Sequence, residues 1–220
     1  MCENIRWEAP ARRGVWLETS AGSQSAEMTV ERDWVVPHPY CPGESLRMVR
    51  EKARITVWPS TVTRRVLDFD LRFRGLVPGV SLGGSDDGKG YGGFSPRVRL
   101  GEDMEFPGQV GEVQPRWLAA VEGGAWVDVV GTYGGTRRGV VIMVHPSHPD
   151  FPLKWLLRKK HGMQNPPWPG RQPVGLSTHG DLRLRYRLVV HTQELDRETL
   201  ASLWRDYAGR KALEFSELLC

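Results

Sequence analysis

The sequence is poor in cysteine. Its three cysteines, Cys2, Cys41 and Cys220, are an odd number and form no Cys-x-x-Cys pair. Small disulfide-stabilised domains and zinc knuckles need several cysteines at short, regular spacings. The sequence therefore excludes both classes, and we expect no structural metal.

Long apolar runs are also missing. No stretch of about 18 consecutive apolar residues, the length that spans a bilayer, occurs in the chain. The first six residues, Met-Cys-Glu-Asn-Ile-Arg, lack the apolar core of a signal peptide. These absences predict a cytoplasmic protein without a membrane partner.

No concentrated block of positive charge is present. The chain has 30 Lys and Arg against 26 Asp and Glu, for a net charge of +4, and its densest basic run is only Arg158-Lys159-Lys160-His161. Nucleic-acid readers usually gather Lys and Arg on one face or helix. We therefore expect no nucleic-acid partner.

Phosphate-binding and serine-nucleophile motifs are absent as well. No strand leads into a Gly-x-Gly-x-x-Gly turn and a helix, and no Gly-x-Ser-x-Gly elbow occurs. The sequence predicts no nucleotide and no other cofactor.

What the chain does have is strict alternation of apolar and charged residues. The segments 67–74 and 182–188 read Leu-Asp-Phe-Asp-Leu-Arg-Phe-Arg and Leu-Arg-Leu-Arg-Tyr-Arg-Leu, which is typical of strands with one wet face. Weaker alternation marks 27–36 and 54–58, and the apolar segment 139–144 predicts a strand covered on both faces. Gly- and Pro-rich loops separate these segments. We predict an all-β fold, an antiparallel β-sandwich.

One helix is predicted, over residues 196–208. Asp196 can cap it, and Leu200, Leu203, Trp204 and Tyr207 recur at the spacing of one apolar helical face. Composition does not shift along the chain and no repeat is found. We therefore expect a single domain over 1–220 with this C-terminal helix packed on it.

The first candidate site is the Pro-rich loop after the buried strand, from His145 to Arg158. Prolines fix this loop, and a rigid loop can hold polar groups in place. His145 is a candidate general base or metal ligand, with His148 and Asp150 nearby in sequence. Trp155 is a candidate stacking face for a sugar, because it lies in a loop instead of a strand. The alternative is a structural loop in which the histidines bond neighbouring carbonyls.

The second candidate site is the glycine-rich segment 89–97, Lys-Gly-Tyr-Gly-Gly-Phe-Ser-Pro-Arg. Its glycines allow close approach of the backbone to a ligand or to another strand, and they leave Tyr91 and Arg97 little covered. The alternative is a bulged edge strand or a tight turn.

The chain resembles the PmoA-like family of bacterial β-sandwich proteins. The resemblance is carried by Gly88–Phe94 with Arg97, by Trp126-Val127-Asp128 with Gly139, by His145–Pro149 through Trp155 and Arg158, and by Gly162 with Asn165-Pro166. The chain departs from the family pattern at Val144 and His148. It resembles the family's N-terminal segment only weakly, at Arg13-Gly14-Val15-Trp16. The resemblance implies a sandwich of the galactose-mutarotase-like or jelly-roll-like type that handles sugars, and it adds Lys89 and Asn165 to the substrate-binding candidates.

The leading hypothesis is therefore a carbohydrate-binding or carbohydrate-active domain for a neutral or oxidised sugar or another small polar molecule. In the enzymatic version His145 exchanges a proton, Arg97 or Arg158 stabilises negative charge, and Trp155 stacks on the sugar. Tyr91, Lys89, His148 and Asn165 complete the binding site. The alternative is an interaction domain without chemistry that forms a homo-oligomer through an uncovered sheet edge. Copper-dependent oxygenation, the family label, ranks third.

Overall fold

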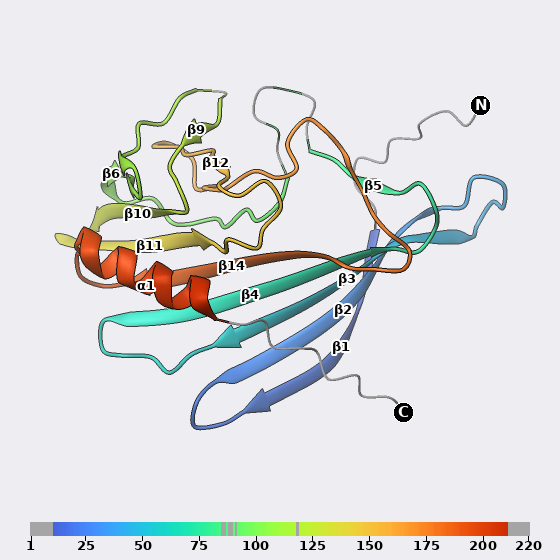
Figure 1. Ribbon diagram of the computed structural model, residues 1–220, viewed down its shortest axis with the longest axis horizontal. Helices are drawn as coiled ribbons and strands as arrows, with labels where there is room; N and C mark the ends of the chain where they lie inside the picture. Colours follow the sequence, from blue (N-terminus) through green and yellow to red (C-terminus); the bar gives the residue numbers. More distant parts are fainter. Residues whose placement is uncertain (1–10, 85–86, 88–89, 91, 118, 211–220) are drawn as a thin grey trace.

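The computed structural model describes residues 11–84, 87, 90, 92–117 and 119–210, with side chains described from Glu18 onward. It is built around one large antiparallel sheet with a single C-terminal helix (Figure 1). The strands are β1 (Ala11–Ala21), β2 (Ala26–Pro37), β3 (Ser45–Val57), β4 (Arg64–Gly75), β5 (Ser81–Leu82), β6 (Glu102–Glu105), β7 (Pro107–Gly108), β8 (Gly111–Glu112), β9 (Val121–Glu122), β10 (Trp126–Tyr133), β11 (Thr136–Val144), β12 (Lys154–Trp155), β13 (Val174–Gly175) and β14 (Leu182–His191). The helix is α1 (Arg197–Gly209).

The large sheet runs in the order β1-β2-β3-β4-β14-β11-β10-β7-β8, and β6 also pairs with β10. The two strands with the clearest alternation, β4 and β14, lie side by side over ten residue pairs, from Leu182 opposite Phe73 to His191 opposite Arg64. This pairing aligns their apolar side chains on one face and their charged side chains on the other. Two two-stranded sheets, β12-β9 and β13-β5, complete the β structure of the described residues.

The apolar face of the large sheet carries the main core. Phe73 on β4 and Leu184 and Tyr186 on β14 pack there with side chains of the loops and short strands, including Trp155 and Trp168. Figure 1 shows β6, β9 and β12 on this side of the sheet. The sandwich-like arrangement predicted from the sequence is confirmed, although loops and short strands make up most of the second layer.

The opposite face is covered only in part, by α1. Leu200 and Tyr207 of the helix are buried against Trp126, Met143 and Val189 of β10, β11 and β14. The Asp196 carboxylate accepts a hydrogen bond from the Thr199 backbone N–H at 2.7 Å, which caps the helix as predicted. No helix among the described residues is long and apolar enough to cross a membrane.

The segment 139–144 is confirmed as a strand covered on both faces, since Val141 and Met143 pack under α1 while Ile142 and Val144 belong to the main core. β1 ends the strand order of the described sheet. Association of two copies through such an edge stays a prediction.

Candidate functional site

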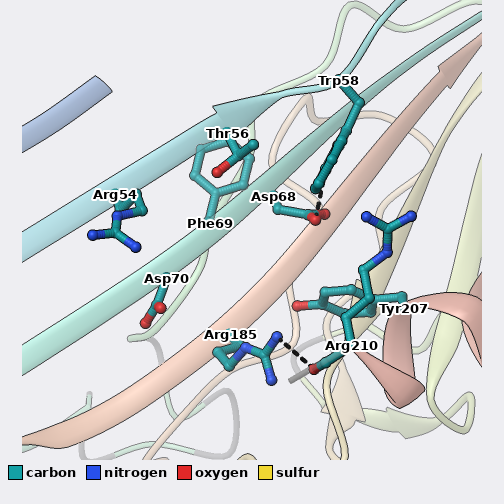
Figure 2. Close-up of a pocket in the computed structure, with 9 residues that line it drawn as sticks. All are labelled: Arg54, Thr56, Trp58, Asp68, Phe69, Asp70, Arg185, Tyr207 and Arg210. Atoms are coloured by element: carbon teal, nitrogen blue, oxygen red, sulfur yellow. Dashed lines mark hydrogen bonds between the residues drawn. The ribbon is translucent and has the colours of Figure 1, made fainter. Parts of the chain in front are cut away.

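A pocket opens on the helix side of the sheet, beside the C-terminal end of α1. Its volume is about 250 Å³. Figure 2 shows its side chains, which come from β3, β4 and β14, from the end of α1 and from the turn after β3. The lining residues are Arg54, Thr56, Trp58, Asp68, Phe69, Asp70, Arg185, Tyr207 and Arg210.

Strand register places three of the charged residues of this pocket in one row. Asp70 of β4 lies opposite Arg54 of β3 on one side and opposite Arg185 of β14 on the other. Because side chains two residues apart share a face, Thr56 and Asp68 form the next row toward the helix. The charged residues whose alternation predicts a solvent-exposed face on β4 and β14 therefore form the floor of the pocket.

Both carboxylates of the pocket already have cationic partners. Asp68 accepts two hydrogen bonds from Arg187, at 2.6 Å from Nε and 2.8 Å from Nη2, and a third from Trp58 Nε1 at 2.8 Å. Asp70 is held by Arg183 through Nε at 2.7 Å and through Nη2. Such two-point pairs fix the orientation of both partners.

Arg185 differs from these arginines because its partners are uncharged. Its Nη1 lies 2.7 Å from His145 Nε2, and its Nη2 donates to the Arg210 carbonyl at 3.2 Å. In the part of the chain that the structure describes, no carboxylate forms an ion pair with it. Burial, followed by the charge of Arg183, lowers the pKa of Arg185, yet a guanidinium stays charged at any physiological pH.

Tyr207 completes the pocket with an aromatic ring and a hydroxyl group. The ring lies 4.6 Å from the Arg187 guanidinium and 5.8 Å from that of Arg185, and the side chain is only 1% exposed. Its hydroxyl has no hydrogen-bond partner among the described residues. Figure 2 shows the hydroxyl pointing away from α1 toward the other lining residues. Burial raises the pKa of Tyr207 well above its usual value, so this hydroxyl stays protonated and can donate a hydrogen bond.

His145 lies behind Arg185 and does not line the pocket. Its Nδ1 accepts from the Ser147 backbone N–H at 3.0 Å and lies 2.8 Å from Ser147 Oγ, and its Nε2 lies 2.7 Å from Arg185 Nη1. Burial and the neighbouring Arg185 lower the pKa of His145 to about 4. His145 is therefore a neutral group that orients Arg185, and its ring is not free to accept a substrate proton.

The lowered pKa of His145 predicts a loss of stability in mild acid. Between about pH 6.5 and pH 4 the unfolded chain binds a proton at this residue and the folded chain does not, so the free energy of unfolding falls as the pH falls through this window. Urea unfolding at a series of pH values should show a smaller fall in the His145→Asn variant. Since His148 is present in both proteins, its own lowered pKa cancels in the comparison. Equal pH slopes would contradict the assignment.

The other residues predicted from the Pro-rich loop do not join His145. His148 lies under the apolar face, where its Nε2 accepts from the Tyr186 hydroxyl at 2.7 Å and its Nδ1 donates to the Pro149 carbonyl. The two histidines therefore face opposite sides of the sheet and do not converge on one ion. Among the described residues, no group of three or more His, Cys, Asp or Glu side chains is placed to hold a metal.

Trp155 is fully buried in the core, and its Nε1 donates to the Gly124 carbonyl at 2.9 Å. This position leaves no ring face for a sugar, contrary to the stacking role predicted for it. The loop does not expose Trp155 because its segment pairs with β9 and turns inward.

Arg158, Asn165 and Arg97 lie apart from the pocket. Arg158 is 9% exposed, and its backbone is clamped by the buried amide of Gln164, at 2.7 Å from both the Arg158 N–H and the Arg158 carbonyl. Asn165 is buried and pairs with Leu156 through the backbone. Arg97 is exposed and forms an isolated bridge with Met163.

The glycine-rich segment is used for close packing in its described part. A Cβ at Gly92 would lie 2.7 Å from the Trp168 carbonyl oxygen, which explains why no side chain fits there. Phe94 stacks on Tyr186 with ring centroids 4.6 Å apart. Lys89 and Tyr91 lie outside the described residues.

Sequence reasoning missed the pocket residues, although a signal was present. Asp68 and Asp70, and Arg183, Arg185 and Arg187, stand at alternate positions of two strands, and we interpreted them as a face exposed to water. Their opposite charges could have suggested that the two strands pair. The position of α1, which buries part of this face, could not be read from either strand.

Comparisons with known proteins give one match. A family model described as "Family of unknown function (DUF6807)" matches residues 8–205. No curated protein and no solved structure matches the chain. The resemblance to the PmoA-like family is therefore wrong, because the family that matches is DUF6807 and nothing in the comparisons indicates a PmoA-like protein. The motifs on which the resemblance was based are short and rich in Gly, Pro and Trp, and these residue types recur wherever tight loops pack on a β core.

Proposed function

The chain belongs to DUF6807, a family of unknown function, and we propose from its pocket that it binds a small carboxylate-bearing molecule, with an oxidised sugar as the ligand class. The observation that carries this proposal is the Tyr207 hydroxyl, which is buried, protonated and without a partner among the described residues. It stands beside Arg185, a cation whose partners are all uncharged. A ligand carboxylate would accept hydrogen bonds from both groups.

The size and lining of the pocket favour a ligand of about one ring. Its volume of about 250 Å³ lies just below the usual range of about 300–1,000 Å³ for small-molecule sites. The Trp58 and Tyr207 rings supply apolar surface, and Thr56 adds a hydroxyl. Aromatic surface beside a few polar groups suits a sugar, which presents C–H faces and hydroxyls.

The arrangement supports binding better than catalysis. A general base needs a free lone pair within reach of the ligand, but Asp68 and Asp70 are each held by an arginine, and both ring nitrogens of His145 already have partners. Tyr207 has a raised pKa and holds its proton. These groups orient and neutralise a bound anion.

The experiment is isothermal titration calorimetry with galacturonate, glucuronate and gluconate, each compared with its neutral counterpart, on wild type and Tyr207→Phe. Wild type should bind at least one acid about tenfold more tightly than the neutral sugar. Tyr207→Phe should lower that affinity by about tenfold, since a hydrogen bond to a charged group contributes about 1.5–3 kcal/mol. The variant should also unfold with a free energy about 1 kcal/mol higher, because it removes a buried unsatisfied hydroxyl.

Tyr133→Phe is the matched control, because the Tyr133 hydroxyl donates to the Arg99 carbonyl at 2.7 Å, away from the pocket. It should leave the affinity for the acid unchanged. The proposal fails if no acid binds more tightly than its neutral counterpart, or if Tyr207→Phe binds the acid as well as wild type does.

A further inference from the structure

A second surface with binding chemistry lies at a tight turn between β8 and β9. Arg116 and Ala119 form an isolated bridge that closes this turn, and Trp117 stands at its tip with 74% of its surface exposed. Every other tryptophan whose side chain the structure describes is buried or half-buried. Trp117 therefore does not serve the core, and its ring is open to a ligand.

A loop from the partner strand of β9 lies beside this turn. The turn comes just before β9, the loop 156–165 follows β12, and β9 pairs with β12. The ring centroids of Trp117 and His161 are 6.2 Å apart. Figure 1 shows β9 and β12 on the apolar side of the large sheet, whereas the pocket opens on the helix side. The two surfaces are therefore separate.

The loop 156–165 is held in shape from inside by one buried amide. The Gln164 side chain accepts from the Arg158 backbone N–H at 2.7 Å and donates to the Arg158 carbonyl at 2.7 Å and to the His161 carbonyl at 2.9 Å. Gln164 is fully buried, while residues 159–161 at the tip are exposed. A tip fixed in this way loses little conformational freedom when a ligand binds.

The two tips carry three exposed cations, Arg116, Lys159 and Lys160. Arg116 and Lys160 are the chain neighbours of Trp117 and His161, so positive charge flanks the ring pair on both sides. Among the described residues, none of the three forms an ion pair with a carboxylate. We refer to these five residues as the aromatic-basic patch. A ligand that fits it has an apolar face and negative charges beside that face.

We propose that the aromatic-basic patch binds an acidic polysaccharide, with Trp117 packed on the C–H face of one sugar and the cations on the carboxylates of that sugar and its neighbours. This inference rests on the proposed function for its ligand class and adds a second surface that holds a longer chain of such sugars. The Trp117 and His161 rings are tilted by 40° and form one platform. Single-stranded nucleic-acid binders instead stack successive bases on aromatic rings along a basic groove, so the patch favours the polysaccharide.

The test is calorimetry at fixed ionic strength with polygalacturonate and with its neutral methyl ester. Wild type should bind the acid at least tenfold more tightly than the ester. Trp117→Ala, and separately the double variant Lys159→Gln, Lys160→Gln, should each lower the affinity for polygalacturonate by about tenfold. Unfolding curves verify that these surface variants are folded.

Tyr40→Ala is the matched control. Tyr40 is 88% exposed and its ring also lies near a histidine, His38, at 6.4 Å between centroids, but its chain neighbours are uncharged. This variant should bind polygalacturonate as wild type does. An equal loss of affinity in Tyr40→Ala and Trp117→Ala would overturn the patch as a specific site.

The pocket variant Tyr207→Phe separates the two proposals, because it should weaken the binding of monomeric galacturonate and keep the affinity for the polymer. If the monomer binds and the polymer does not, or if Trp117→Ala binds the polymer as wild type does, the patch is overturned and the proposed function stands. If the polymer binds through Trp117 and no monomeric acid binds, the proposed function fails instead. A single-stranded DNA oligonucleotide that binds more tightly than polygalacturonate, and whose affinity Trp117→Ala lowers, would overturn the polysaccharide in favour of a nucleic acid.

Discussion

Replacing Arg185 with glutamine should lower the affinity for a carboxylate ligand by about a hundredfold while leaving the free energy of unfolding almost unchanged. The affinity falls because the variant removes a positive charge of the pocket whose partners, His145 Nε2 and the Arg210 carbonyl, are neutral. Charge-assisted bonds contribute up to about 3 kcal/mol each, which corresponds to about two orders of magnitude.

Stability is expected to hold because folding gains little from a half-buried cation without a carboxylate partner. Burying such a charge costs free energy, and burial lowers the pKa of Arg185 accordingly. A glutamine amide can still donate a hydrogen bond to the Arg210 carbonyl. The two effects on stability therefore offset each other, while the electrostatic attraction for the ligand is lost.

Calorimetry with the best acid ligand and urea unfolding measure the two quantities. Arg185→Lys should fall between wild type and Arg185→Gln, since lysine keeps the charge but loses the planar fork that matches a carboxylate. Arg205→Gln is the control on exposed α1 surface and should bind as wild type does. An affinity for Arg185→Gln within about threefold of wild type would place the ligand carboxylate elsewhere.

The strands and the helix could be predicted because their signals are local. Alternation over 67–74 and 182–188 falls within β4 and β14, and the apolar face around Leu200 and Tyr207 falls within α1. A period of two residues requires one buried and one wet face, and this depends on nothing outside the strand. The all-β class and the single C-terminal helix follow from these patterns.

The site could not be predicted, because it depends on contacts between distant segments. Arg187 meets Asp68 across 119 residues, and Arg183 meets Asp70 across 113. Periodicity gives the face of each side chain but not the neighbouring strand. The Pro-rich loop misled the prediction for a related reason: its length and composition indicate a rigid loop, yet they do not indicate whether Trp155 turns toward water or into the core.

Arg187→Met should be the most destabilising of these substitutions, by about 3 kcal/mol. Arg187 is 2% exposed and holds the Asp68 carboxylate at two points, at 2.6 and 2.8 Å. Removing one partner of a buried pair leaves the other charge without compensation, which costs about 3–5 kcal/mol. We expect the low end of this range, because 18% of the Asp68 side chain stays exposed and Trp58 Nε1 still donates to it.

The double variant Arg187→Met, Asp68→Leu distinguishes two causes of the lost stability, an uncompensated Asp68 carboxylate and the loss of packing around Arg187. If the cost comes from the uncompensated carboxylate, removing that carboxylate as well should restore most of the lost stability, because apolar replacement of a buried pair is often neutral or stabilising. Asp206, the third partner of Arg187 at 3.3 Å, is half exposed and also bonded to Arg210, so it is not left without a partner. Chemical unfolding of wild type, both single variants and the double variant gives the coupling free energy directly. A double variant as unstable as Arg187→Met would instead assign the loss to the contact between Arg187 and the Tyr207 ring, and would make that contact the support of the pocket wall.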